Sequence, residues 1–395
     1  MWRDTSAERS VSDLPQPARL APLILATMAS QSLMAVLAPT IVAIGDDLGA
    51  SVGAVGQARS LTAGVAIASS ALIMARIDAV GIPGLLALGG ALGVVACAAV
   101  AAAPTLAVLL AAHALTGLAF ACLLSAGFAG VAAFPTERRP WAIGYVAAAN
   151  ALAWIVVNPS AGALTEGVSW RAAQAVPAAI ALAALFAARS AAPAPGAPNP
   201  PRLRTLLAEG TARRWIGVEL TAYGAWTALL TFVGAFFITQ LGVGEAATGW
   251  FLAAGAGAYF VTSTRSGALA NRIPRRRLVF AAAVLMAALV AVLLNATQSV
   301  VVAVVLFCLV GLAAGVRTPT SGGLGLEQVP NRAGAMMGAR TAATQFGYLL
   351  GAVVGGAVIA GPGYGALGFV LAGGMLLSAW LVLGVHDPLE RRAEP

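Results

Sequence analysis

The sequence predicts an all-α membrane protein in which twelve transmembrane helices form two pseudo-symmetric bundles of six. Composition is the first reason: the chain has 395 residues, of which 59% are hydrophobic and 10% charged, whereas a soluble protein carries about 25% charged residues. The second reason is that the apolar residues form long runs, and the third is that the two halves resemble each other.

A helix needs about 20 apolar residues to cross a bilayer core of about 30 Å. Apolar runs bounded by charges, glycine or proline predict spans at 20–44, 53–75, 82–103, 105–132, 141–163, 172–190, 214–240, 246–268, 278–297, 299–323, 336–360 and 364–385. The proline-rich, basic stretch between spans six and seven is too polar to insert. We therefore predict a tail (1–19), a first bundle (20–190), a cytoplasmic linker (191–213), a second bundle (214–385) and a tail (386–395).

The charged residues predict the topology. All 23 basic residues are arginines, and most fall in the tails, the linker and alternate loops. The opposite loops hold Asp46, Asp47, Glu166 and Glu245, with only Arg171 among basic residues. By the positive-inside rule both termini are cytoplasmic, so the net charge of +8 reports topology and not nucleic-acid binding. Arginine without lysine, together with abundant alanine, suggests a GC-rich bacterial genome and hence the bacterial inner (plasma) membrane. The first 18 residues show no cleavable signal peptide.

An internal repeat supports the two-bundle plan. HALTGLAF (113–120) aligns with FCLVGLAA (307–314), PTERRPWAIG (135–144) with PNRAGAMMG (330–338), and IDAVGIP (77–83) with ANRIPRR (270–276). Parallel repeats of six spans place a substrate cavity between the two halves.

These features resemble the major facilitator superfamily, and more narrowly its twelve-span drug/proton antiporters. The family's loop 2–3 signature reads Gly-x-x-x-Asp-Arg-x-Gly-Arg-Arg. Matching positions in the second half are Gly267, Arg272, Arg275 and Arg276, with Asn271 in place of the acid. In the first half Asp78 and Gly81 match.

A second resemblance lies in span five, where the antiporters end on Gly-Pro-x-x-Gly-Gly. The stretch 144–164 keeps Pro159 and Gly162, while Asn158 replaces a glycine. The resemblance implies the major facilitator fold, rocker-switch alternating access, a proton gradient instead of a cofactor, and function as a monomer. The span-five motif favours the exporting branch.

Alternating access needs contacts that form in one state and break in the other. We expect Asp78 to meet Arg340 and the start of span eleven, forming a lock between the halves. In the mirrored position Arg272, Arg275 and Arg276 would meet Glu137, Glu327 and the start of span five. The simpler interpretation is that these arginines only anchor the topology.

Ionisable residues inside spans are expensive, at about 2.5–3.5 kcal/mol on insertion scales, and so are candidates for function. The candidates for proton coupling or substrate binding are His113, Glu219, Arg59 and Arg317. His113 has an unperturbed pKa of about 6.5, suited to proton exchange, or it is a neutral, hydrogen-bonded histidine. Glu219 either couples protons or snorkels toward the arginines at 213 and 214. Arg59 and Arg317 could bind an anionic substrate, and Arg59 could instead pair with Asp46 or Asp47.

Polar and aromatic residues predict a cavity for an amphiphilic organic molecule. The predicted lining is Gln31, Asn150, Trp154, Asn158, Tyr223, Trp226 and Gln345. The alternative is hydrogen bonding between helices.

The leading hypothesis is proton-coupled efflux of a small organic molecule, a drug or a natural product. Span one lacks the acidic residue common among such exporters. The alternative is an uptake permease for a small organic anion. A membrane receptor or an intramembrane enzyme is disfavoured because the chain has no soluble domain and no GxSxG, HExxH or P-loop motif. The expected partners are the substrate and the lipid bilayer.

Overall fold

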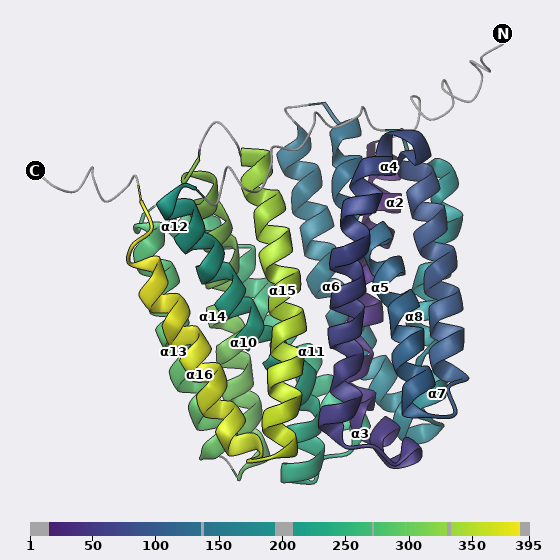
Figure 1. The fold of residues 1–395 in the computed structure, drawn as a ribbon, viewed down its shortest axis with the longest axis vertical. Helices are drawn as coiled ribbons and strands as arrows, with labels where there is room; N and C mark the ends of the chain where they lie inside the picture. Colours follow the sequence, from purple (N-terminus) through teal and green to yellow (C-terminus); the bar gives the residue numbers. More distant parts are fainter. Residues whose placement is uncertain are drawn as a thin grey trace, which may run out of the picture.

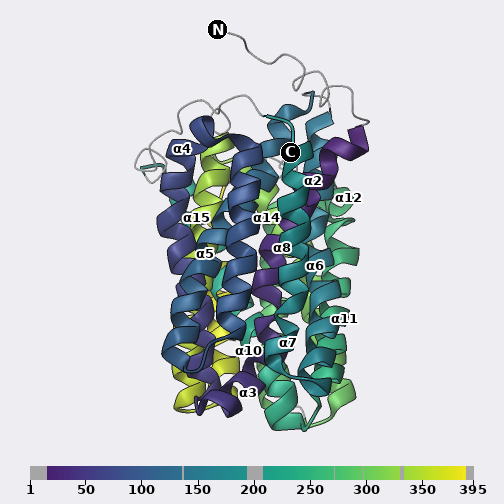
Figure 2. The same cartoon turned by 90° about the vertical axis from the view of Figure 1, so that its right-hand side faces the viewer.

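The computed structural model describes residues 16–135, 138–193, 208–270, 272–296, 298–329 and 333–387, and every regular element in these ranges is helical. In the first part of the chain the helices are α2 (Gln16–Ala35), α3 (Leu37–Leu48), α4 (Val52–Ala101), α5 (Leu106–Ala129), η1 (Gly130–Ala133), α6 (Arg139–Gly167), α7 (Trp170–Ala173), α8 (Ala175–Ala187) and η3 (Ala188–Ser190). In the second part they are α10 (Gly210–Leu241), α11 (Glu245–Ser263), α12 (Ser266–Ala270), α13 (Arg275–Asn295), α14 (Val300–Leu326), α15 (Ala333–Ala360) and α16 (Tyr364–Val382). The long helices run side by side along the longest axis (Figures 1 and 2).

All twelve predicted spans are helical. Within the described ranges, ten segments are long and apolar enough to cross a membrane. The other two predicted spans correspond to the first limb of α4 and to α11 with α12. Span seven differs in its start, because α10 begins at Gly210 and not at 214. The domain boundaries themselves stay a prediction.

Short polar and glycine residues set the helix boundaries. The hydroxyl oxygens of Ser51, Thr105 and Ser169 accept backbone N–H groups in the first turns of α4, α5 and α7, which satisfies donors that a helix start leaves free. Gly81 has φ 71°, a conformation that only glycine adopts readily. The resulting kink divides α4 into two limbs, 52–80 and 82–101, which supply predicted spans two and three.

The chain folds into two halves, residues 16–193 and 208–387, coloured purple through blue to teal and teal through green to yellow in Figure 1. They meet along two seams, because α4 packs on α15 and α6 packs on α11. We call the end that carries Asp46, Asp47, Glu166 and Glu245 the acidic end; it includes α3 and α7 at the bottom of Figure 1. The opposite end, with the start of α13 and the end of α8, is the basic end.

The halves are in close contact near the acidic end. The backbones of Gly53 and Gly356 touch across the α4–α15 seam, and Gly162 touches the carbonyl of Glu245 across the α6–α11 seam. Hydrogen bonds join the same seams: the Gln57 Nε2 donates to the Ala352 carbonyl at 3.1 Å, and the Ala246 N–H donates to the Glu166 carboxylate at 2.9 Å. The described structure is therefore closed at its acidic end.

Candidate functional site

A buried carboxylate forms the centre of the C-terminal half. Glu219 of α10 is fully buried, and both of its oxygens are bonded. Arg340 of α15 donates from Nε to Oε2 at 2.7 Å, and Arg317 of α14 donates from Nη2 to Oε1 at 3.3 Å. The Ser321 hydroxyl donates to Oε1 at 2.8 Å. Glu219 does not snorkel toward the basic end, so that interpretation of the sequence was wrong; its partners come from two other spans.

Both arginines of this cluster have additional acceptors. Arg317 also donates to the Val218 carbonyl at 3.1 Å and to the Ser378 hydroxyl at 3.2 Å. Arg340 donates to the Thr318 carbonyl at 2.9 Å. A buried charge is tolerated only when it is paired and hydrogen-bonded, and each of the three groups is paired, although the Nε of Arg317 has no hydrogen-bond partner in the described structure. Two guanidiniums surround one carboxylate, so the cluster carries an excess of one positive charge.

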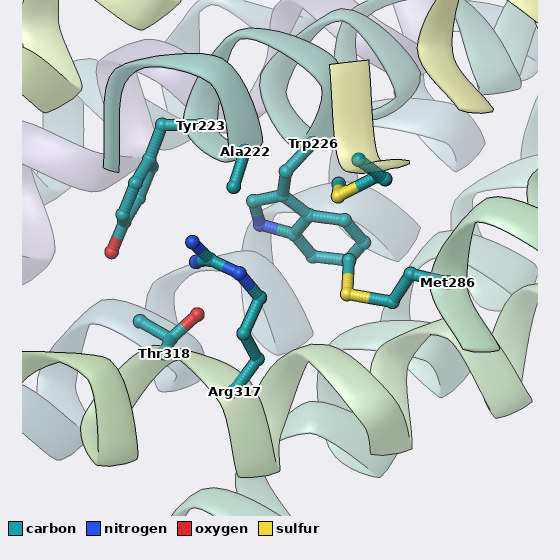
Figure 3. Close-up of a pocket in the computed structure, with 7 residues that line it drawn as sticks. Ala222, Tyr223, Trp226, Met286, Arg317 and Thr318 are labelled. Carbon is teal, nitrogen blue, oxygen red and sulfur yellow. The ribbon is translucent and has the colours of Figure 1, made fainter. Parts of the chain in front are cut away.

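The cluster borders a narrow pocket in the same half. Its lining consists of Ala222, Tyr223, Trp226, Met286, Arg317, Thr318 and Met375. Figure 3 shows Arg317 reaching from α14 toward Tyr223 and Trp226 of α10. The lining leaves about 180 Å³ of space, divided into gaps too small for a water molecule. An occupant would therefore require the helices or side chains to move.

The N-terminal half holds an arginine without a carboxylate partner among the described residues. Arg59 of α4 is only 1% exposed. Its Nη2 donates to the Met34 carbonyl at 2.8 Å and its guanidinium lies over the Trp154 ring at 5.6 Å, while Nε and Nη1 have no hydrogen-bond partner in the described structure. Arg59 does not pair with Asp47, as the sequence had allowed, because Asp47 binds Arg171 at 2.6 Å.

Arg59 faces the junction of the two halves. Tyr348 of α15 is close enough to the Arg59 guanidinium to interact with it electrostatically. The Tyr348 and Tyr223 rings are 6.5 Å apart, and Tyr223 in turn lies under the Arg340 guanidinium at 6.0 Å. Two tyrosines, Tyr348 and Tyr223, therefore lie on the path from Arg59 in one half to Arg340 in the other.

His113 lies close to Arg59, but its ring is hydrogen-bonded within its own helix. It is 6% exposed, and its Nδ1 is 2.9 Å from the Leu109 carbonyl in its own helix. The proton then resides on Nδ1, since a carbonyl can only accept. Its role in proton coupling stays a prediction.

Only some of the residues predicted to line the cavity contact one another. The Trp154 indole donates to the Gln31 side chain at 3.2 Å, beside Arg59. Trp226 stacks on Tyr259. Asn158 is fully buried and neither amide atom is bonded within the described residues, and the Gln345 Oε1 is likewise free there. Asn150 donates to the Ala147 carbonyl of its own helix.

The gating residues differ from expectation. Arg340 does not begin its helix: it lies seven residues after the first residue of α15 and turns to Glu219. The side chain of the expected partner Asp78 lies outside the described residues. Glu137 and Asn271 lie entirely outside them. Arg275 does meet Glu327, at 3.0 Å, but within one half and not between halves.

The other positions of the loop signature also have local roles. The Arg276 guanidinium donates to the Leu383 carbonyl at 3.2 Å, which ties α13 to the end of α16. Arg272 and Gly267 are exposed. Gly81 supplies the kink of α4. Pro159 and Gly162 lie in the α6–α11 seam, where Gly249 packs against Asn158 and Pro159.

Sequence reasoning missed the residues that complete the charged cluster. Ser321 follows Arg317 by one helical turn and therefore shares its face, which is a usable signal within GVRTPTSGG. Ser378 and Tyr348 have no signal of this kind, because single hydroxyl residues in apolar spans usually bond their own helix.

Comparison with known proteins agrees with this architecture. The model of the Major Facilitator Superfamily matches residues 23–217 and again residues 215–395. Among solved structures, the crystal structure of a D-xylose–proton symporter is similar, with a TM-score of 0.76, 15% sequence identity and coverage of 94% of this chain and 98% of the other. No curated protein sequence matches the chain.

Proposed function

Because the chain belongs to the major facilitator superfamily and is a multi-pass membrane transporter and not an enzyme, we propose that it carries a small organic anion together with protons. One observation supports this most strongly. The described interior of the bundle holds the buried guanidiniums of Arg59 and Arg317 and the partly buried one of Arg340, against the single carboxylate of Glu219. Uncompensated charge in a low-dielectric interior strongly favours an anionic ligand.

Glu219 is the proposed proton-binding group. While it is ionised, it neutralises part of the positive charge on Arg340 and Arg317. When a proton binds to it, the site becomes more positive, and Arg340, whose side chain is 23% exposed, becomes available to an anion. Proton and anion then bind cooperatively, and linkage makes this coupling reciprocal. Cooperative binding of both ligands is the requirement for symport.

The aromatic groups indicate the rest of the substrate. Trp154 lies against the Arg59 guanidinium, and Tyr348 and Tyr223 lie next to each other on the path from Arg59 to Arg340. Aromatic faces and a few fixed polar groups suit a ligand with a flat apolar body. We therefore expect an aromatic or amphiphilic carboxylate as the substrate.

A second candidate is proton-driven export of a small organic molecule, the function that the span-five motif favours. Pro159 and Gly162 lie in the α6–α11 seam, so this motif takes part in closing the acidic end. Export by antiport requires that proton and substrate compete for the site. A neutral or cationic substrate that displaces the proton from Glu219 would satisfy this requirement.

Orientation follows from the arginine distribution. We propose that the basic end and both termini are cytoplasmic, in the bacterial inner membrane, by the positive-inside rule. The described structure is then closed to the outside. The structurally similar D-xylose protein is named as a proton symporter, which is compatible with a proton gradient as the energy source here.

Vesicles of both orientations test the proposal. A panel of aromatic carboxylates, with the corresponding amides and amines, is first screened by thermal stabilisation of the purified protein at pH 5.5 and pH 7.5. Ligands that stabilise are then assayed in right-side-out and everted vesicles with an imposed proton gradient. We expect carboxylates to stabilise more at the lower pH and to accumulate in right-side-out vesicles. Stabilisation by amines that weakens at the lower pH, with proton-driven uptake into everted vesicles, would replace symport by export.

A further inference from the structure

A second cavity lies in the N-terminal half, far from the charged cluster. It has a volume of about 450 Å³ and is lined by Pro83, Ala87, Leu185, Phe186, Ala188 and Arg189. The first two residues begin the second limb of α4, and the others end α8 and form η3. It is therefore a groove between two helices at the basic end.

The groove opens toward apolar surroundings. Phe186 is 57% exposed, and Leu88 and Leu182 on the same two helices are 48% and 42% exposed. Apolar side chains exposed to this extent on membrane-spanning helices face lipid tails. The volume corresponds to about 15 water molecules at about 30 Å³ each, yet five of its six lining residues are apolar. An acyl chain suits this space better than water does.

One cation lies at the rim of the groove. The guanidinium carbon of Arg189 is 5.8 Å from the centre of the Phe186 ring, and within the described ranges it has no carboxylate partner. The side chain is exposed. Arginine at this position can bind a phosphate through two parallel hydrogen bonds.

We propose that this groove binds an anionic phospholipid, with its phosphate on Arg189 and one acyl chain along Pro83, Ala87 and Phe186. A phospholipid has an anionic headgroup at the membrane interface and apolar acyl chains deeper in the membrane. The groove has the corresponding parts, a guanidinium at the interface and an apolar floor. A peptide is disfavoured as occupant, because its backbone polar groups would find no partners on an apolar floor.

The site has a defined structural consequence. Pro83 directly follows the α4 kink at Gly81, and Gly90 further along the same limb packs against Leu185 of α8. A lipid in the groove therefore connects two helices of the same half and does not bridge the two halves. It would stabilise the N-terminal bundle without favouring either state of alternating access.

Native mass spectrometry of the full chain tests the site. The protein is titrated with phosphatidylglycerol and with phosphatidylcholine of identical acyl chains. We expect tighter binding of phosphatidylglycerol, and Arg189→Gln to reduce this preference about five-fold, the effect of one basic side chain near a membrane surface. Arg265→Gln is the control, because Arg265 is also an exposed arginine but bonds its own helix at the Val261 carbonyl.

A second variant tests the acyl part of the groove. Ala87→Phe fills the floor and retains Arg189, and we expect it to weaken binding of both lipids. Soluble glycerol 3-phosphate, which has no acyl chains, should not displace the bound phosphatidylglycerol. Equal retention of the two lipids by the unmodified chain, or no response to either substitution, would overturn the proposal; the second result would mean that lipid binds elsewhere or that the chain itself fills the groove.

Discussion

Arg340 donates from its Nε to the Glu219 Oε2 at 2.7 Å, and the carboxylate that accepts this bond is fully buried. The bond joins α10 to α15, and α15 also forms the seam with α4 of the other half. In the proposed mechanism, proton binding to Glu219 would therefore act on a helix that also forms the interface between the halves.

Glu219→Gln is expected to uncouple transport from the proton gradient. Glutamine resembles the protonated acid in shape and charge, so substrate should bind with an affinity that no longer depends on pH. Exchange of labelled for unlabelled substrate should continue, while accumulation driven by a proton gradient should be lost. Counterflow and gradient-driven uptake in the same proteoliposomes measure the two. Glu327→Gln is the control, since Glu327 pairs with Arg275 near the surface.

One result would contradict this role. If Glu219→Gln abolished counterflow as well as accumulation while the purified protein kept its melting temperature, Glu219 would be part of substrate binding and not of proton coupling. Loss of folding is the separate risk, because removing one partner of a buried ion pair costs about 3–5 kcal/mol. Arg340→Gln combined with Glu219→Gln removes one cation with the carboxylate and keeps the net charge of the cluster at one positive charge, with Arg317 still bonded to the Val218 carbonyl and the Ser378 hydroxyl; this double variant controls for that cost.

Arg59→Gln is expected to raise stability and to weaken binding of anions. The guanidinium is buried, with Nε and Nη1 unbonded in the described structure, and an uncompensated buried charge costs several kcal/mol. The melting temperature of the ligand-free variant should therefore rise. Affinity for a carboxylate should fall about 10- to 100-fold, as expected for a charge-assisted hydrogen bond of about 1.5–3 kcal/mol. Thermal unfolding with and without the carboxylate measures both.

Arg265→Gln serves as the matched control for Arg59, because it removes an exposed arginine that caps its own helix. It should change neither quantity. A lower melting temperature in Arg59→Gln, with unchanged carboxylate affinity, would show that Arg59 is a structural group held by the Met34 carbonyl and the Trp154 ring.

The fold class was predictable because lipid imposes one rule on every span. Backbone groups in a bilayer must be bonded within the helix, so apolar length alone identifies a span, and the major facilitator fold is confirmed. The partners of Glu219 were not predictable in the same way. Arg317 and Arg340 are distant in sequence, and only packing of α10 against α14 and α15 brings them together. The nearby arginines at 213 and 214 favoured the wrong interpretation, snorkelling.

The narrower resemblance was less informative than the fold. Glu327 was among the partners expected for Arg275, and the two residues do meet, but their ion pair lies within one half and not between the halves. Such a signature fixes where arginines lie, at the ends of helices, but not whether their ion pairs form within one half or between the halves. The drug/proton antiporter branch accordingly remains a hypothesis, whereas membership of the superfamily is established.

His113→Gln is expected to leave proton coupling intact. The ring is buried and its Nδ1–H is already bonded to the Leu109 carbonyl, so a charged imidazolium would have to exist next to the Arg59 guanidinium, a repulsive arrangement. Substrate accumulation driven by the same proton gradient should remain within about two-fold of that of the unmodified protein. Loss of pH dependence in His113→Gln, with coupling retained in Glu219→Gln, would transfer the proton site to the histidine.

Gly162→Ala is expected to open the acidic end. A Cβ at this position would overlap the Glu245 carbonyl across the α6–α11 seam, and overpacking of this kind costs about 1–3 kcal/mol. Since only the closed state has this contact, the ratio of open to closed molecules should rise about five- to 100-fold.

Spin labels at Val168 and Gln240, exposed on opposite halves at this end, measure the separation by pulsed electron resonance. Gly144→Ala on the same helix is the control, because nothing lies within 4 Å of an added Cβ there. An unchanged distance distribution in Gly162→Ala, together with unchanged transport, would mean that the seam does not part during the cycle.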